Sequence, residues 1–250
     1  MESTEVRDEQ KGRVVIVNGD DFGLSEDVNR GIAIAYENGI LSSASLMTEG
    51  AAAENAAAYA KLHSVLSLGL HIDLGCWMYR DGEWPQVYHV VNLEDADAVA
   101  VEVARQLERF RHLVGADPTH LDSHQHVHLR GPARRIVLDA ARSLNIPLRS
   151  LTPGLKYEGS FYGQTDTGQE LHDAIRPERL MEILASLPSG ITELGCHPAL
   201  GHNIGDPVYC AEREKELRAL CDPRVRSTLD AEGIELRSFL TAGRAWWARE

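Results

Sequence analysis

The sequence has few cysteines, little positive charge and no long apolar run, and each shortage excludes a class of protein. None of its apolar runs approaches the roughly 20 residues that a transmembrane helix needs. Its 250 residues carry 38 acidic and 25 basic side chains, and the net charge of −13 argues against a nucleic-acid partner or an anionic membrane surface. The four cysteines match no zinc-ribbon or redox spacing, so we expect most of them to be buried free thiols.

The chain also lacks internal repeats, low-complexity tracts and a linker that would divide it into two domains. Residues 1–12 are polar and charged, without the apolar core of a signal peptide, so we expect a disordered tail and a cytoplasmic protein. We expect residues 13–250 to form a single domain, because single-domain α/β barrels commonly have about this length.

Segments with the apolar spacing of strands alternate along the chain with segments that have the spacing of helices. Strands are expected at 13–18, 41–48, 66–72, 118–129, 191–196 and 234–239, with a short one at 147–151. Helices are expected at 25–38, 51–62, 93–114, 131–144, 177–187, 211–220 and 223–232. Long loops are expected at 75–92, 152–172 and 199–209. This alternation predicts an α/β fold with a mostly parallel sheet and right-handed crossovers.

The motif NGDDFG at 18–23 follows the first expected strand and carries two adjacent carboxylates, Asp20 and Asp21. Neighbouring carboxylates repel each other unless a cation lies between them or one of them is protonated. One carboxylate that binds a metal ion and one that transfers a proton would explain the pair. A turn with a helix cap is the alternative, because Ser25 is placed to cap the helix over 25–38. Both interpretations stay open at this point.

Two further expected strands carry residue types that bind metal ions, namely His71 and a histidine cluster around His124. In parallel α/β barrels the carboxyl ends of the strands meet on one face, so these side chains can converge. One carboxylate and two imidazoles leave coordination positions open for water and substrate, as a catalytic divalent site requires.

The cluster THLDSHQHVH at 119–128 has ionisable side chains at alternate positions. In an extended strand they point to one face: His120, Asp122, His124, His126 and His128. Five such groups in an apolar core would each need a partner, so we expect some of them to support metal ligands, and Asp122 to orient an imidazole. A solvated edge strand is the alternative.

His197 follows the expected strand at 191–196 and precedes Pro198. Histidine titrates near neutral pH, so His197 is a candidate general acid. A structural histidine at a strand end is the alternative.

Together these motifs resemble the YdjC-like carbohydrate deacetylases, the chito-oligosaccharide deacetylase family, over nearly the whole chain after the tail. The stretches that carry the resemblance are 17–25 (VNGDDFGLS), 69–71 (GLH), 119–128, 161–163 (FYG) and 196–198 (CHP). The resemblance implies an irregular (β/α) barrel related to that of the polysaccharide deacetylases. It also implies a metal ion held by Asp21, His71 and His124, with Asp20 as general base and His197 as general acid.

The activity that this resemblance implies is a metal-dependent hydrolysis that removes the acetyl group from an N-acetylated sugar or small oligosaccharide. The cofactor would be one divalent ion, magnesium or zinc, and the partner a small N-acetylated carbohydrate, while a homo-oligomer stays open. We expect Asp122, His126 and His128 to support the metal ligands. Aromatic residues stack on sugar rings, which makes candidates of Phe161, Tyr162 and Trp77. Asp73 follows His71 where the family is often uncharged, so it could touch the site.

Two other functions remain compatible with these residues. One is a metal- or carbohydrate-binding protein without hydrolase activity. The other is a glycosidase on the same fold, in which two carboxylates would cleave the sugar bond itself.

Overall fold

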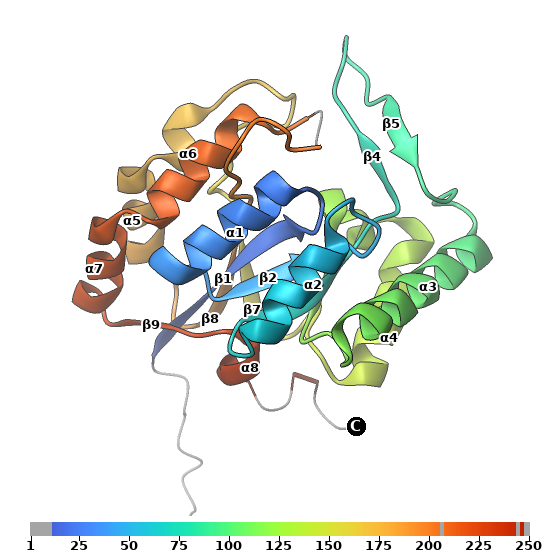
Figure 1. Ribbon diagram of the computed structural model, residues 1–250, viewed down its shortest axis with the longest axis horizontal. Helices are drawn as coiled ribbons and strands as arrows, with labels where there is room; N and C mark the ends of the chain where they lie inside the picture. Colours follow the sequence, from blue (N-terminus) through green and yellow to red (C-terminus); the bar gives the residue numbers. More distant parts are fainter. Residues whose placement is uncertain (1–11, 206–207, 244–245, 248–250) are drawn as a thin grey trace, which may run out of the picture.

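The computed structural model describes residues 12–205, 208–243 and 246–247, and its centre is a seven-stranded parallel sheet (Figure 1). The strands follow the order β6-β3-β2-β1-β8-β7, and β9 also pairs with β1. Their bounds are β1 Arg13–Phe22, β2 Ser43–Leu46, β3 Ser67–Ile72, β6 Leu121–Ser123, β7 Leu155–Glu158, β8 Gly190–Cys196 and β9 Ile234–Leu236. The α/β fold with a mostly parallel sheet is therefore confirmed.

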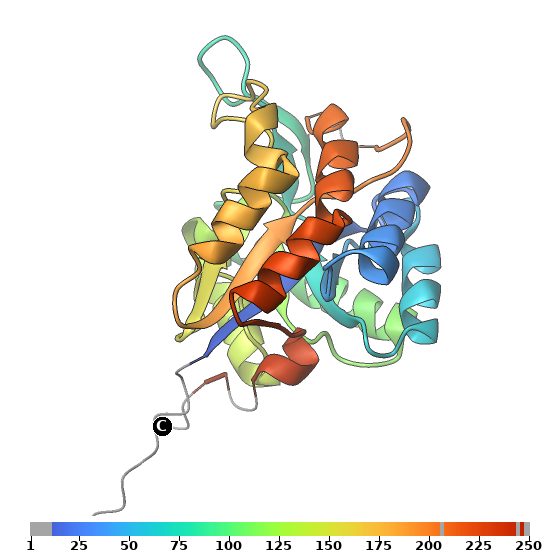
Figure 2. The ribbon, with the colours of Figure 1, turned by 90° about the vertical axis from the view of Figure 1, so that its left-hand side faces the viewer.

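Helices α1 to α7 cover the outside of this sheet, whereas α8 lies at its lower end in Figure 1, where Phe239 packs with Ile16. The bounds of the helices are α1 Glu26–Asn38, α2 Ala53–Leu62, α3 Ala96–Val114, α4 Gly131–Leu144, α5 Pro177–Ala185, α6 Ala211–Leu220, α7 Pro223–Ala231 and α8 Phe239–Ala242. Helices α1 and α2 lie over β1 and β2, with α5, α6 and α7 to one side and α3 and α4 to the other (Figures 1 and 2). The sheet curls as an incomplete barrel.

The central strand β1 continues beyond Asn18, where the sequence predicted its end, as far as Phe22. Its residues from Val15 to Phe22 are buried. The register with β2 shifts between Gly19 and Phe22, and Asp21 has a φ of 65°. This irregularity breaks the alternation of a regular strand, so the adjacent Asp20 and Asp21 both reach the same cavity.

The structure accommodates both interpretations of the 18–23 motif, the pair of functional carboxylates and the turn with a helix cap. Ser25 caps α1, because its hydroxyl accepts a hydrogen bond from the Val28 N–H at 3.3 Å. The two carboxylates lie before this cap, within the strand, so the cap does not use them.

The strand predicted over 118–129 forms only at Leu121–Ser123, and the rest of the prediction is wrong. Strand β6 has three residues and passes into a 3₁₀ segment, η1 (His124–Leu129), in which Gln125 and His126 have φ values of 47° and 53°. The expected shared face of the alternate histidines therefore ends at residue 123, because the backbone no longer alternates.

Three other expectations change in part. The predicted loop 75–92 contains an antiparallel hairpin, β4 (Gly75–Trp77) with β5 (Gln86–His89). The predicted loop 152–172 contains β7, which pairs with β8. Instead of the short strand at 147–151 there is a single bridge, Leu121 to Leu148.

All four cysteines are free thiols, and Cys76 and Cys196 are buried, whereas Cys210 is exposed. Within the described residues, no helix is long and apolar enough to cross a membrane. The predicted tail, apart from Gly12, lies outside the described residues.

Candidate active site

A cavity of about 770 Å³ opens at the carboxyl ends of the strands. Its floor carries Asp20, Asp21, His71, His124 and His197. One wall comes from the β4–β5 hairpin, and the opposite wall comes from the loop 159–168. The cavity therefore gathers side chains from separate parts of the chain.

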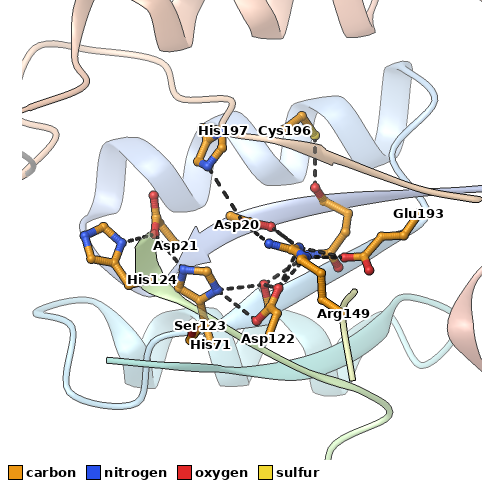
Figure 3. A network of polar contacts seen from close by, with 12 residues as sticks. Asp20, Asp21, His71, Asp122, Ser123, His124, Arg149, Glu193, Cys196 and His197 are labelled. Carbon is orange, nitrogen blue, oxygen red and sulfur yellow. Dashed lines mark hydrogen bonds and ion pairs between the residues drawn. The ribbon is translucent and has the colours of Figure 1, made fainter. Parts of the chain in front are cut away.

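The predicted metal ligands converge in this cavity (Figure 3). The Oδ1 atom of Asp21 lies 3.1 Å from Nε2 of His71 and 3.2 Å from Nδ1 of His124. Ligand atoms of a tetrahedral zinc site, each about 2.0–2.1 Å from the ion, lie roughly 3.3 Å apart. The donor types and their spacing therefore fit a divalent cation.

A second set of candidate ligands shares His71 and consists otherwise of Asp20 and Asp122. The guanidinium of Arg149 already lies on both carboxylates, 2.6 Å from Oδ2 of Asp20 and 2.7 Å from Oδ2 of Asp122. A metal cation there would meet a fixed positive charge, so this second set is the poorer site.

The carboxylate of Asp21 divides its two oxygens between two tasks. Its Oδ2 accepts a hydrogen bond from Arg213 at 2.7 Å, which leaves Oδ1 for the two histidines. Burial alone would raise the pKa of Asp21. The Arg213 charge and the hydrogen bonds with His124 and His71 outweigh burial and hold that pKa well below its usual range.

The ring of His71 is oriented by Asp122. Oδ1 of Asp122 lies 2.8 Å from Nδ1 of His71, and the Ser45 hydroxyl donates to Oδ2 of Asp122 at 2.9 Å. A proton on Nδ1 leaves Nε2 directed at Asp21, which is the tautomer that a metal ligand needs.

Metal binding at this site is expected to release protons. Burial lowers the pKa of His71, but the carboxylates of Asp122, Asp21 and Asp20 raise it to about 10. Burial likewise opposes the charged form of His124, but its hydrogen bonds to Asp21 and Cys76 and the Asp21 charge raise its pKa well above the usual value. Both imidazoles therefore hold an extra proton at pH 7 before an ion binds.

Because the ion displaces these protons, its affinity is expected to rise with pH between about pH 6 and pH 9. Calorimetric titration at pH 7, in buffers that differ in ionisation enthalpy, should show the release of about two protons per ion, one from each imidazole. An affinity that is independent of pH, with no proton release, would contradict this ligand set.

The carboxylate of Asp20 is held in place by Arg149. Its two oxygens accept from Nη1 at 2.6 Å and Nη2 at 2.7 Å, and Asn18 donates to Oδ1 at 2.8 Å. Burial raises the pKa of Asp20, but the Arg149 charge and hydrogen bonds outweigh burial and lower it, so Asp20 is ionised.

Arg149 is fully buried and also contacts Glu193 at 2.7 Å. Our sequence reasoning missed both residues. The available signal was a charged residue inside an apolar, strand-like run, in PLRSL at 147–151 for Arg149 and in ITELGC at 191–196 for Glu193. Such a residue needs a buried partner.

The ring of His197 lies beside Asp20 on the cavity floor, with its Nε2 3.8 Å from Oδ2 (Figure 3). The segment that follows it packs closely on α1, where a Cβ atom on Gly31 would lie 2.3 Å from Cα of Ala199. Burial lowers the pKa of His197 to about 4, against the raising effect of Asp20, so the resting imidazole is neutral.

The remaining histidines of the cluster lie away from the metal ligands. The His128 Nδ1 contacts the Ser123 hydroxyl at 2.6 Å, and its Nε2 contacts the backbone carbonyl of Arg149 at 3.1 Å. His126 lies edge-on to the ring of Tyr157 at 5.3 Å. His128 thus supports the segment that carries Arg149, and neither residue contacts Asp21.

His120 is also separate from the predicted ligands. Its Nε2 contacts Oδ1 of Asn18 at 3.0 Å, and its ring stacks on Phe239 at 3.9 Å. Through Asn18 it supports the carboxylate of Asp20, so it belongs to the packing beneath the site.

The predicted aromatic contacts all line the cavity, but they differ in exposure. Phe161 is fully buried, and Tyr162 stacks on Tyr209 with a centroid distance of 4.4 Å. Trp77 is partly exposed, and its backbone exchanges two hydrogen bonds with the Gln125 side chain, at 2.8 and 2.7 Å. Gln125 therefore fixes the hairpin wall next to His124.

Asp73 supports this wall rather than touching the predicted ligands. Its carboxylate accepts hydrogen bonds from the Gly75 N–H and the Tyr88 hydroxyl, both at 2.9 Å. The hairpin is thus anchored at its base.

Two deacetylases are similar to this chain in sequence over most of its length. A carbohydrate deacetylase of Geobacillus stearothermophilus is 32% identical over 91% of this chain and 97% of its own length. A chitooligosaccharide deacetylase of Serratia marcescens is 30% identical, over 91% and 98% of the two chains.

Two solved structures share the fold. A protein of Enterococcus faecalis described as a putative cellobiose-phosphate cleavage protein superposes with a TM-score of 0.74 at 23% identity, covering 93% of this chain and all of that one. A family 4 carbohydrate esterase of Streptomyces lividans superposes with a TM-score of 0.56 at 13% identity, over 96% and 99% of the two chains. The predicted likeness to the polysaccharide deacetylase fold is confirmed.

The family model for YdjC-like proteins matches residues 14–231, which include each of the predicted ligands and the candidate base and acid. The chain belongs to the YdjC-like protein family.

Proposed function

We propose that this protein is a metal-dependent carbohydrate deacetylase that hydrolyses the amide of an N-acetylated sugar or small chito-oligosaccharide and releases acetate. The observation that carries the proposal is the convergence of Asp21, His71 and His124 in one cavity, beside Asp20 and His197. The deacetylase names of the relatives from Geobacillus and Serratia support it.

We assign the metal to Asp21, His71 and His124. A divalent ion held there would supply a Lewis acid for the attacking water and for the acetyl carbonyl oxygen. Two imidazoles and one carboxylate suit zinc, and magnesium is the other candidate.

Asp20 then acts as the general base. It is ionised, lies next to the ligand Asp21, and is fixed by Arg149 so that its carboxylate cannot turn away. It takes a proton from the water that attacks the acetyl carbon. His197, whose Nε2 lies 3.8 Å from Oδ2 of Asp20, delivers a proton to the leaving nitrogen, so the products are acetate and an amino sugar.

Neither alternative function accounts for these contacts equally well. A glycosidase needs one protonated carboxyl group that donates to the leaving oxygen, but Arg149 and Arg213 hold the pKa values of Asp20 and Asp21 below the usual range, so both are ionised. A protein that only binds a metal has no need of Asp20 beside His197.

The test is acetate release from N-acetylglucosamine, its dimer and its trimer by the metal-loaded protein. We expect acetate in equal amount to free amine, and its loss after chelator treatment with recovery on adding the ion back. A metal-loaded, folded protein that releases no acetate from any of these sugars would contradict the proposal, whereas shortened sugars without acetate would identify a glycosidase.

A further inference from the structure

Behind His197 lies a buried carboxyl group that the mechanism above does not use. Glu216, on α6, has no solvent exposure. Its Oε2 accepts a hydrogen bond from the backbone N–H of His197 at 2.5 Å, and its Oε1 accepts one from the Tyr209 hydroxyl at 2.5 Å. Tyr209 is fixed in turn, because its hydroxyl accepts from the Gly163 N–H at 2.7 Å.

The imidazole of His197 lies between two carboxyl groups. Nε2 is directed at Asp20, whereas Nδ1 lies 3.9 Å from Oε1 of Glu216. Among the described residues, this buried Nδ1 has no hydrogen-bond partner. The rings of Tyr162 and Tyr209 lie edge-on to the imidazole at 5.4 and 5.5 Å, so Glu216 is the polar side chain that a small turn of the ring would reach.

The charges around this pair come from several elements. The ionisable groups that act on His197 or Glu216 are Asp20 and Asp21 from β1, Arg149 from the segment after α4, Cys196 from β8, Tyr209 from the loop before α6, and Arg213 in the first turn of α6. Of these, the Tyr209 hydroxyl donates directly to Glu216, and Asp20 faces the other ring nitrogen of His197.

We propose that Glu216 is a positioning residue for His197 and shares one proton with its Nδ1, so that the carboxyl group supplies the proton that makes His197 an effective acid. This inference rests on the proposed deacetylase function, and it concerns the origin of the proton that the leaving amine receives.

The proton balance closes over one cycle. As Nε2–H of His197 passes its proton to the leaving nitrogen, Nδ1 takes the proton of the Glu216 carboxyl group, which becomes a carboxylate. After the products leave, Asp20 returns the water proton to Nε2, and Nδ1 gives its proton back to Glu216. The imidazole stays neutral at the start and the end of the cycle.

The pKa values of Glu216 and His197 agree with a proton that starts on the carboxyl group and moves to Nδ1 during the reaction. Burial raises the pKa of Glu216 to about 8 and lowers that of His197 to about 4, so the shared proton rests on the carboxyl group at pH 7. Activity should therefore fall as the pH rises through about 8, where Glu216 loses this proton.

The test compares Glu216→Gln with Glu214→Gln in the metal-loaded enzyme. The amide keeps the shape of the side chain but has no acidic proton, so kcat is expected to fall about 100-fold, with KM and metal content unchanged. The alkaline limb of the kcat profile should move by more than about one pH unit toward acid, because His197 is then left as the acid. Glu214 is on the same helix, pairs with Arg218 at the surface, and undergoes the same replacement of a carboxyl group by an amide. Its variant should match the wild type.

A fall in kcat with the alkaline limb in its original place would mean that Glu216 only supports packing, and would overturn the proposal. If Glu216→Gln does not fold, ¹⁵N NMR of the imidazole in the wild-type protein tests whether Nδ1 of His197 shares a proton with Glu216. We expect Nδ1 of His197 to follow the titration of a group with a pKa near 8, with His197→Asn used for assignment.

These two measurements also separate the inference from the proposed function. An Nδ1 that is insensitive to pH in an enzyme that releases acetate would overturn only the Glu216 assignment. The expected Nδ1 titration in a protein that releases no acetate would count only against the deacetylase.

Discussion

Replacing Asp20 with asparagine is expected to leave the metal bound and to reduce kcat by about a hundred- to ten-thousand-fold. The amide cannot take the proton of the attacking water, whereas Asp21, His71 and His124 keep their donor atoms. Turnover is measured as acetate release, and metal content by elemental analysis of the purified variant. Because an asparagine side chain at this position still fits beside Asn18 and Arg149, the fold should remain intact by circular dichroism.

His124→Ala is the matched variant for this experiment, because it removes a predicted ligand and leaves Asp20 in place. It should lose the metal together with the activity. If Asp20→Asn loses the metal while His124→Ala keeps it, the base and ligand assignments must be exchanged, and the set of Asp20, His71 and Asp122 becomes the better candidate.

Much of this site could be predicted because its chemistry stands out at strand ends. Asp20, Asp21, His71 and His197 lie at the carboxyl ends of β1, β3 and β8, where the topology of a parallel sheet brings them together. The strand and helix spacing identified the fold class for the same reason, since the buried faces repeat with a regular period.

The part that could not be predicted depends on contacts between distant segments. The side chains of 118–129 would alternate only in an extended chain. Gln125 and His126 instead adopt left-handed backbone conformations, which the local sequence pattern does not predict. That turn directs His124 at Asp21 and lets Gln125 hold the hairpin. Arg149 was missed because its role depends on three carboxylates that lie far from it in the sequence: Asp20 in β1, Asp122 in β6 and Glu193 in β8.

Arg149 is the buried positive charge that neutralises these three carboxylates beneath the site. The guanidinium lies 2.6–2.7 Å from oxygens of Asp20, Asp122 and Glu193, and the ring of Tyr157 covers it at 4.8 Å. It holds the pKa of Asp20 and Asp122 below the usual range, whereas burial raises that of Glu193 to about 7. Without it, carboxylates that lost their water on folding would repel each other with little compensation.

Arg149→Met is therefore expected to lower the free energy of unfolding by about 3–5 kcal/mol, the usual cost of leaving buried charges without their partner. The loss should grow as the pH rises from about 5 to 8. The carboxyl pKa values of the folded variant would lie above the unfolded ones, so the folded state then binds more protons and loses stability with rising pH. Urea denaturation at both pH values measures this effect.

The control is Arg105→Met, which removes a half-exposed guanidinium that pairs with the exposed Glu49 and with Glu102, a mostly buried carboxylate that also accepts a hydrogen bond from Gln106. Its cost should be about 1 kcal/mol or less and should vary little between the two pH values, because water screens such pairs. Because the three carboxylates are buried, an Arg149→Met variant that costs no more than Arg105→Met would mean that they are protonated in the native protein. Asp20 would then not be the ionised base on which the proposed mechanism depends, so this stability measurement also tests the catalytic assignment without using a substrate.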